Sequence, residues 1–387
     1  MDRFAIPFYR PPIVGGELDG LRQAVEARHL SADGEFTRRC QSWLDNRLGP
    51  CTALLTHSCT GALELAMLLC DLRPNDEVIM PSFSFVSTAS AVALRGARPV
   101  FVDIRPDTLN LDETRIAEAI TERTRGILVT HYAGVACEMQ SILEIARKND
   151  LIVIEDAAHA LLARYRGRAL GTIGSLGALS FHSTKNIVSG EGGALLVGDP
   201  RLAARAAILR DKGTNRDAFL GGKVAAYQWV DLGSSFAPSE LVASFLLPQL
   251  ENADRLTDRR QKIWETYHQA FAPLEMAEHI RRPAPPADCE HNAHIYYLVL
   301  PGRLERDAFI RHMAAAGIDC RSHYEALHLS PAGMRYGRTD GPLRVTERTV
   351  DGLVRLPLWA DMLEEPARVI AAAEAYFRAS AVHRHRS

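Results

Sequence analysis

The residues best suited to chemistry lie between positions 180 and 193, in the run Ser-Phe-His-Ser-Thr-Lys-Asn-Ile-Val-Ser-Gly-Glu-Gly-Gly. Apolar residues flank this run at 176–179 and 194–197, so its one lysine, Lys185, is expected between two buried strands. A desolvated amine is shifted toward its neutral, nucleophilic form, which is the form that makes an imine with a carbonyl group. The alternative is a lysine at the mouth of a loop whose amine simply reaches solvent.

A second candidate group follows the apolar segment 51–56, where Ser58, Cys59 and Thr60 lead into an expected helix. Unpaired backbone N–H groups and the positive end of the helix dipole would hold a phosphate there without any basic side chain. An ordinary helix cap by Ser58 or Thr60 is the alternative explanation.

Two adjacent carboxylates, Glu155 and Asp156, end the apolar segment that begins at Leu151. Either one could keep a ring nitrogen protonated and so make the ring an electron sink, or could simply cap the next helix. Phe83 or Phe85 could stack on a planar ring, although an aromatic residue near a strand end is more often part of the core. A phosphate cradle, a stacking aromatic, a carboxylate and an imine-forming lysine are together what pyridoxal phosphate requires.

The elements that must position these groups alternate between short apolar segments and amphipathic helices. Strands are expected at 51–56, 77–80, 99–102, 127–130 and 151–155 and on both sides of Lys185, with helices at 60–72, 85–94, 112–119 and 139–149. This alternation indicates a mostly parallel sheet that helices cover on both faces. Ligands of such sheets bind at the carboxyl ends of the strands, where the candidate groups fall together with His131 and Tyr132.

The chain of 387 residues exceeds what a single core usually supports, so we expect two domains. The large α/β domain would cover 1–250 and begin with an extended N-terminal arm that could lie across a partner subunit, and a small α+β domain would cover 251–387. Pro248 should kink or break a helical region at 239–270, and the Pro-rich segment 282–286 resembles a linker.

Composition gives no case for a nucleic-acid or membrane partner, because the net charge is −2 and no apolar run is long enough to span a bilayer. The seven cysteines form no CxxC pair and no cluster with zinc-ligand spacing. We therefore expect reduced thiols, no metal site, no signal peptide and a cytoplasmic location.

Two sets of residues resemble the DegT/DnrJ/EryC1/StrS family of sugar aminotransferases: 180–186 with 190–193, and 155–159. The resemblance spans nearly the whole chain. It implies a fold-type I pyridoxal phosphate enzyme, usually a homodimer, that transaminates keto sugars attached to a nucleotide and has pyridoxamine phosphate as the intermediate form of its cofactor. Four longer runs, 34–40, 131–139, 167–174 and 212–216, resemble the branch of the family that makes dTDP-4-amino-4,6-dideoxygalactose.

The resemblance also implies roles for individual residues. Lys185 matches the catalytic lysine that binds the cofactor covalently, and Asp156 matches the partner of the ring nitrogen. The phosphate would be bound by Cys59, Thr60 and Ser180, and the ring would stack on Phe85.

Two positions depart from the common pattern of the family. His159 stands where many members have Gln; it could contact the ring hydroxyl group, and a histidine there is expected to titrate near neutral pH. Many members also bring an Asn from the partner subunit to the phosphate, and the aligned stretch here, 233–238, offers Ser235 as a substitute.

The implied reaction transfers the amino group of L-glutamate to C4 of dTDP-4-keto-6-deoxy-D-glucose, giving dTDP-4-amino-4,6-dideoxygalactose and 2-oxoglutarate. A C3 aminotransferase or an enzyme of UDP-sugars is one alternative. Relatives that deoxygenate C3 carry His in place of the lysine, so Lys185 argues against that activity, and Lys185 and Asp156 together argue against a non-catalytic regulatory relative. The sugar would enter either a surface polysaccharide or an antibiotic.

Overall fold

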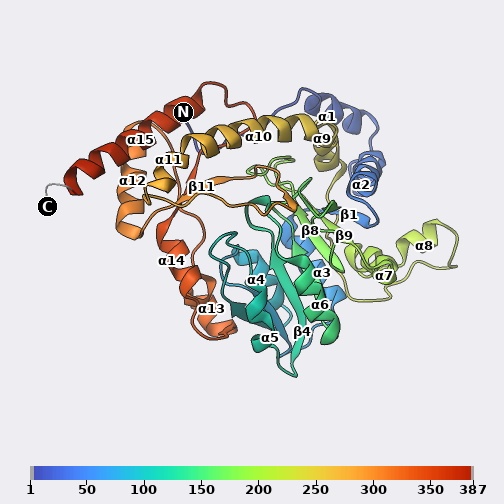
Figure 1. The fold of residues 1–387 in the computed structure, drawn as a ribbon. Coiled ribbons are helices and arrows are strands. Elements are labelled where there is room, and N and C mark those ends of the chain that lie inside the picture. Colours follow the sequence, from blue (N-terminus) through green and yellow to red (C-terminus); the bar gives the residue numbers. More distant parts are fainter. Residues whose placement is uncertain (1–3, 385–387) are drawn as a thin grey trace.

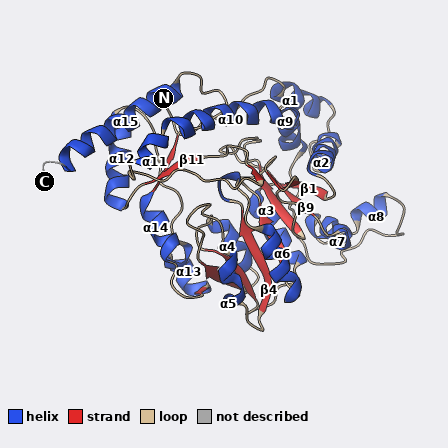
Figure 2. Ribbon diagram, in the orientation of Figure 1, coloured by secondary structure: helices blue, strands red, loops and turns tan. Residues whose placement is uncertain are grey.

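The computed structural model of the protein describes residues 4–384, in which helices surround a central sheet (Figures 1 and 2). The α-helices in this range are α1 (Glu17–Glu26), α2 (Glu35–Leu48), α3 (Cys59–Leu69), α4 (Val86–Ala93), α5 (Ile116–Ala119), α6 (Met139–Lys148), α7 (Pro200–Arg210), α8 (Arg216–Leu220), α9 (Glu240–Glu251), α10 (Ala253–Ala270), α11 (Ala272–Met276), α12 (Arg303–Ala315), α13 (Pro331–Tyr336), α14 (Arg344–Gly352) and α15 (Glu365–Arg384). The strands are β1 (Thr52–Thr56), β2 (Glu77–Pro81), β3 (Arg98–Val102), β4 (Thr124–Thr130), β5 (Ile152–Asp156), β6 (Arg164–Tyr165), β7 (Arg168–Ala169), β8 (Leu176–Ser180), β9 (Gly193–Val197), β10 (Cys289–Glu290), β11 (Tyr296–Val299), β12 (Arg338–Thr339) and β13 (Leu353–Leu356).

The large sheet has eight strands in the order β1-β9-β8-β5-β4-β2-β3-β12. Every neighbouring pair from β8 to β12 is parallel, whereas β9 runs antiparallel to both β1 and β8. The mostly parallel sheet expected from the alternating pattern is confirmed. Because β9 alone reverses, the carboxyl ends of the other strands meet at one edge, and the segment with Lys185 connects β8 to β9 at that edge.

Apolar side chains on the two faces of this sheet enter two separate core clusters. Val153 and Ile154 are neighbours on β5, yet Val153 packs in the cluster beneath α2, α6 and α9, and Ile154 packs in the cluster beneath α3, α4 and α7. Successive strand residues point to opposite faces, so this division follows directly from the period of a strand. The same alternation decides which side chains near the strand ends can reach a ligand.

A third core cluster gathers residues from Ile263 to Phe377 around the two-stranded sheet β11-β13. Ile6 belongs to this cluster and forms a bridge with Ile318, so the beginning of the described chain packs against its own C-terminal half. Helix α10 contributes Leu256 to the first cluster and Ile263 to the third. It thereby connects the core on one face of the large sheet to the core around β11 and β13.

Two local expectations are refined by the structure. The helical region around Pro248 is divided at Asn252, which ends α9 four residues after the proline, whose ring is tolerated inside α9. The Pro-rich segment 282–286 leads from α11 into β10, which pairs with β6, so it connects a helix of the C-terminal half to a strand that joins β6 and β7 in the three-stranded sheet. Among the described residues, no helix is both long enough and apolar enough to cross a bilayer.

Candidate active site

A cavity of about 860 Å³ lies at the edge where the parallel strands end. Its wall contains all but one of the site residues expected from the sequence: Cys59, Thr60, Phe85, Asp156, His159, Ser180 and Lys185. The exception, Ser235, is exposed in this chain and lies outside the cavity, next to Phe236 in the segment before α9. The topology therefore assembles groups that are separated by up to 126 positions in the sequence.

Lys185 is held in a short turn, because its N–H donates to the carbonyl oxygen of His182 at 2.9 Å. The next residue, Asn186, anchors the turn by donating to the carbonyl oxygen of Asn292 and by a 2.9 Å contact with Nδ1 of His294. Burial lowers the pKa of Lys185 to about 8, even though the nearby Cys59 and Asp156 act in the opposite direction. A useful fraction of this amine is therefore neutral and nucleophilic near neutral pH.

Asp156 is the last residue of β5, and its carboxylate faces the cavity. Oδ2 accepts a hydrogen bond of 2.7 Å from the Thr88 hydroxyl group, and Oδ1 accepts one of 3.1 Å from the Ala158 N–H. Burial raises the pKa of Asp156 above its ordinary value, and these bonds and the charge of Lys185 offset the rise only in part. A cation placed against the carboxylate, such as a protonated ring nitrogen, would favour its ionised form.

Glu155 points to the opposite face of the sheet and has a structural role. Its fully buried carboxylate lies 2.8 Å from Nε2 of His131 and accepts hydrogen bonds from the backbone N–H groups of Gly171, Ile173 and Gly174. The strand period thus decides between the two adjacent carboxylates in favour of Asp156. His131, which contacts Glu155 on that opposite face, does not line the cavity.

The expected phosphate site lies at the first turn of α3. Ser58 caps this helix by accepting a hydrogen bond from the Gly61 N–H, and the Thr60 hydroxyl group lies 2.8 Å from that of Ser87. Since the cap uses one N–H, the remaining N–H groups of the first turn and these hydroxyl groups can bind an anion. Burial raises the pKa of the Cys59 thiol well above its ordinary value, so Cys59 stays protonated.

Gly193 explains why the glycine-rich run returns the chain so closely to the phosphate site. It is the first residue of β9, and a Cβ atom there would lie 2.4 Å from the backbone carbonyl carbon of Ser58. Any side chain at this position would displace the backbone that begins α3. The lysine turn and the expected phosphate site are therefore packed as one unit.

The two phenylalanines after Pro81 have different environments. Phe83 is fully buried and packs its ring 4.9 Å from that of Tyr132, so it belongs to the core. Phe85 lines the cavity and keeps 54% of its surface exposed, which leaves its ring available to a planar ligand. Of the two candidates for stacking, only Phe85 lines the cavity, and its role stays a prediction.

His159 does not behave as the sequence suggested. Burial and the charges of Lys185 and Arg355 lower its pKa well below the ordinary value, so the expectation of titration near neutral pH is wrong for the side chain in this position. Its Nδ1 accepts from the Ala133 N–H at 3.4 Å, and its Nε2 lies 3.3 Å from the Tyr324 hydroxyl group. The neutral ring is thus a hydrogen-bonding group.

The C-terminal half contributes one wall of the cavity, which the sequence did not predict. This wall contains Arg260, His294, Arg321, His323, Tyr324 and Arg355. The rings of His323 and Tyr324 stack with centroids 3.8 Å apart, and Nδ1 of His323 lies 2.8 Å from the Tyr132 hydroxyl group. One feature of the sequence could have indicated this wall: Arg355 is a charged residue within the otherwise apolar strand β13.

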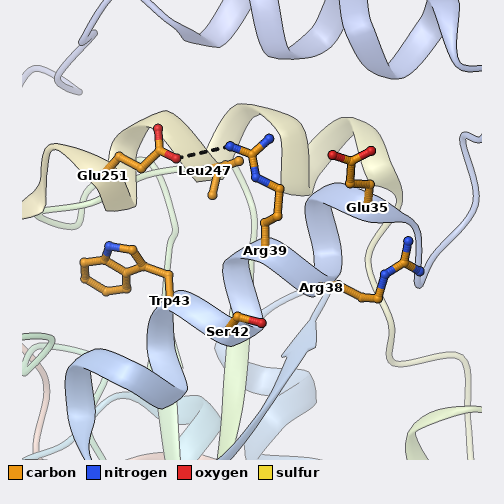
Figure 3. Close-up of a pocket in the computed structure, with 7 residues that line it drawn as sticks. All are labelled: Glu35, Arg38, Arg39, Ser42, Trp43, Leu247 and Glu251. Atoms are coloured by element: carbon orange, nitrogen blue, oxygen red, sulfur yellow. Dashed lines mark hydrogen bonds and ion pairs between the residues drawn. The ribbon is translucent and has the colours of Figure 1, made fainter.

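A second, smaller hollow of about 340 Å³ lies between α2 and α9, where Arg39 pairs with Glu251 (Figure 3). It contains the exposed side chains of the run 34–40. The buried part of that run is fixed by the Glu240 carboxylate, which accepts hydrogen bonds from the N–H groups of Gly34, Phe36 and Thr37. This run therefore joins two helices, and none of its residues lines the cavity around Lys185.

Comparison with known proteins agrees with the geometry of the cavity, because the proteins that match are aminotransferases. The model of the DegT/DnrJ/EryC1/StrS aminotransferase family matches residues 13–374. The chain belongs to that family. It is 33% identical over 366 residues to GDP-perosamine synthase of Caulobacter vibrioides, an alignment that covers 94% of this chain and 95% of that protein.

Two solved structures illustrate how far the fold is shared. The aminotransferase TlmJ of Streptoalloteichus hindustanus is 31% identical with a TM-score of 0.88, over 97% of this chain and 100% of that one. Spr1654 of Streptococcus pneumoniae, solved in PLP and PMP forms, is 26% identical in both; its PLP form has a TM-score of 0.87 over 96% of this chain and 99% of that one. The fold-type I assignment is confirmed.

The residues around the cavity fit pyridoxal phosphate. The first turn of α3 with Thr60 and Ser180 would hold the phosphate, Asp156 the ring nitrogen and Phe85 the ring face, and the amine of Lys185 would hold the carbonyl carbon. When bound, the cofactor supplies an electron-withdrawing ring and a carbon that carries the amino group between two substrates.

Proposed function

We propose that the protein transfers the amino group of L-glutamate to C4 of dTDP-4-keto-6-deoxy-D-glucose. The products are dTDP-4-amino-4,6-dideoxygalactose and 2-oxoglutarate. The observation that carries the transamination is that a partly neutral lysine, a buried carboxylate and the half-buried start of a helix line one cavity. The choice of sugar is supported by the four runs that resemble this branch of the family.

Three residues of the cavity have separate roles in the proposed reaction. The neutral amine of Lys185 takes the proton from the α-carbon of the donor, and in the second half of the cycle the same amine delivers a proton to C4 of the sugar. Asp156, fixed by Thr88, keeps the ring nitrogen cationic while negative charge develops. His159 is neutral, so it acts as a hydrogen-bonding group and takes up no proton during the reaction.

Two of the runs that resemble this branch of the family hold Asp156 in place indirectly, through contacts with Glu155 on the opposite face of the sheet. The run 131–139 supplies His131 and the run 167–174 supplies the backbone N–H groups that bind Glu155, the residue before Asp156. These contacts fix the end of β5, so the runs act on the site through the position of the strand. This is a physical reason for their occurrence beside the catalytic carboxylate.

A homodimer is part of the proposal. Helix α8 and the loop after it project from the body and end near the sheet again (Figure 1). They present apolar side chains to solvent, among them Leu220 at 69% exposure and Trp229 at 75%. A second copy would cover this surface, and Ser235, which lies outside its own chain's cavity, would then be available to the partner's phosphate site. Sedimentation analysis of the wild type and of Trp229→Asp tests this, with a monomeric wild type as the contradicting result.

The substrate assignment is tested by incubating the holoenzyme with L-glutamate and keto sugars linked to dTDP, UDP or GDP, and measuring the 2-oxoglutarate released. The proposal predicts the highest kcat/KM for dTDP-4-keto-6-deoxy-D-glucose. A higher value for the 3-keto isomer or for a UDP sugar would assign the chain to the alternative enzymes of the family. Absence of 2-oxoglutarate with every sugar would contradict transamination itself.

A further inference from the structure

Three arginines line the cavity around Lys185, and two of them are already bound to other groups of the chain. Arg260 donates to the carbonyl oxygens of Ala293, Leu358 and His294, so its guanidinium group is used to fix backbone. Arg321 forms an ion pair with Asp319 at 2.6 Å. The three nitrogens of the Arg260 guanidinium group are thus already hydrogen-bonded, and the charge of Arg321 is already paired with a carboxylate.

Arg355 is different. Its Nε and Nη2 atoms donate to one carbonyl oxygen, that of Ser322, at 3.2 and 2.8 Å, and its guanidinium carbon lies 4.6 Å from the ring centre of Phe8. Within residues 4–384, Arg355 forms no ion pair, and its Nη1 atom has no hydrogen-bond partner. Two contacts therefore fix the plane of the group and leave one edge of its fork unused.

The position of this unused edge is informative. Arg355 extends from β13 into the cavity, and burial, together with a weaker repulsion from Arg355, lowers the pKa of Lys185. Burial also lowers the pKa of Arg355 itself, which shows that a nearby anion would be favourable. The histidines beside it do not compete for that anion, because burial keeps His159, His294 and His323 neutral.

We propose that Arg355 binds a carboxylate of the amino donor and so orients the donor's α-carbon toward Lys185. The inference rests on the proposed function and deepens it by naming the residue that recognises L-glutamate. A guanidinium fork matches a carboxylate with paired hydrogen bonds, and such bonds are strong where water is excluded.

A carboxylate fits this position better than the diphosphate of a sugar nucleotide. In an amino acid the carboxylate is one bond away from the carbon that loses its proton, so it must lie close to the lysine amine. In a nucleotide-linked hexose the sugar ring separates C4 from the diphosphate, which therefore lies farther from Lys185 and toward the cavity mouth. Arg355 lines the same cavity as Lys185, which is where the carboxylate of the donor must be bound.

The test uses glutarate, a five-carbon dicarboxylate that has no amino group to transfer. Its Kd for the holoenzyme is measured by isothermal titration calorimetry for the wild type, Arg355→Gln and Arg355→Lys. Removing a hydrogen bond to a charged group predicts a Kd about 10- to 100-fold higher for Arg355→Gln. Arg355→Lys keeps the charge without the fork and should lie between the two. The visible absorption of each holoenzyme reports that the cofactor is retained.

Arg321→Gln is the matched control, since it removes a guanidinium group over the same Phe8 ring whose charge Asp319 already neutralises. Its Kd for glutarate should change at least five times less than that of Arg355→Gln. Rapid-mixing experiments on the two half-reactions complete the test: Arg355→Gln should need more L-glutamate to bleach the cofactor, while its pyridoxamine form should saturate with keto sugar as the wild type does.

Unchanged binding of glutarate by Arg355→Gln, or a defect confined to the keto-sugar half-reaction, would overturn the inference and leave the proposed function standing. A wild-type holoenzyme that L-glutamate does not bleach would instead overturn the donor in the proposed function, and this inference with it.

Discussion

Replacing Lys185 with methionine should stabilise the cofactor-free protein at pH 7. In the folded chain the pKa of Lys185 is lowered to about 8 from an ordinary value of 10.5, with burial as the main cause. Each unit of difference between the folded and unfolded states corresponds to about 1.4 kcal/mol. A difference of about 2.5 units therefore costs the folded protein about 3 kcal/mol at pH 7, which is a large share of a typical free energy of unfolding.

The pH dependence gives the sign of this effect. Between pH 8 and 10.5 the unfolded chain binds more protons at Lys185 than the folded chain, so the free energy of unfolding of the wild type rises with pH in that window. Methionine has no proton to lose. The advantage of Lys185→Met should thus be largest at pH 7 and shrink steadily as the pH approaches 10.

The assay is urea denaturation of the cofactor-free proteins at a series of pH values, followed by circular dichroism. Lys262→Met, at an exposed position of α10, is the matched control and should change the free energy of unfolding by less than about 0.5 kcal/mol. A Lys185→Met protein less stable than the wild type at pH 7, or an advantage that does not vary with pH, would show that burial of the charged Lys185 amine does not destabilise the fold.

Three further substitutions test other parts of the site. His159→Gln should give a pH–rate profile that superimposes on the wild type between pH 6 and 9, because burial keeps His159 neutral; a profile that loses a limb near pH 7 would contradict this. Gly193→Ala should lower the free energy of unfolding by about 1–3 kcal/mol and weaken cofactor binding in equilibrium dialysis, because the new Cβ meets backbone, whereas Gly302→Ala, with only an ordinary 3.5 Å contact, should do neither. Thr88→Val should lower kcat about tenfold by removing the 2.7 Å hydrogen bond to Asp156, and Thr88→Ser should restore it; equal loss in both variants would show a packing effect.

The sequence predicts the part of this site that depends on local patterns. Lys185, Asp156 and Cys59 all follow or precede short apolar segments, and the rule that strand ends meet at one edge is enough to bring them together. The choice between Glu155 and Asp156 needed the actual phase of β5, because a shift of one residue exchanges the two faces of a strand.

The other half of the cavity could not be predicted in this way. Tyr324 and Arg355 come from segments that reach the cavity only through tertiary packing around β11 and β13. No spacing in the sequence links them to Lys185. The neutral state of His159 was equally hidden, because it follows from burial among other rings rather than from its neighbours in the chain.

We propose above that this chain moves an amino group from L-glutamate to C4 of a dTDP-linked keto sugar. The most direct test supplies L-[15N]glutamate and dTDP-4-keto-6-deoxy-D-glucose to the holoenzyme and locates the label in the product by 1H–15N NMR. We expect 15N on C4 of a galacto-configured sugar for the wild type, and none with Lys185→Ala. Label on C3, label that remains in glutamate, or normal transfer by Lys185→Ala would contradict it.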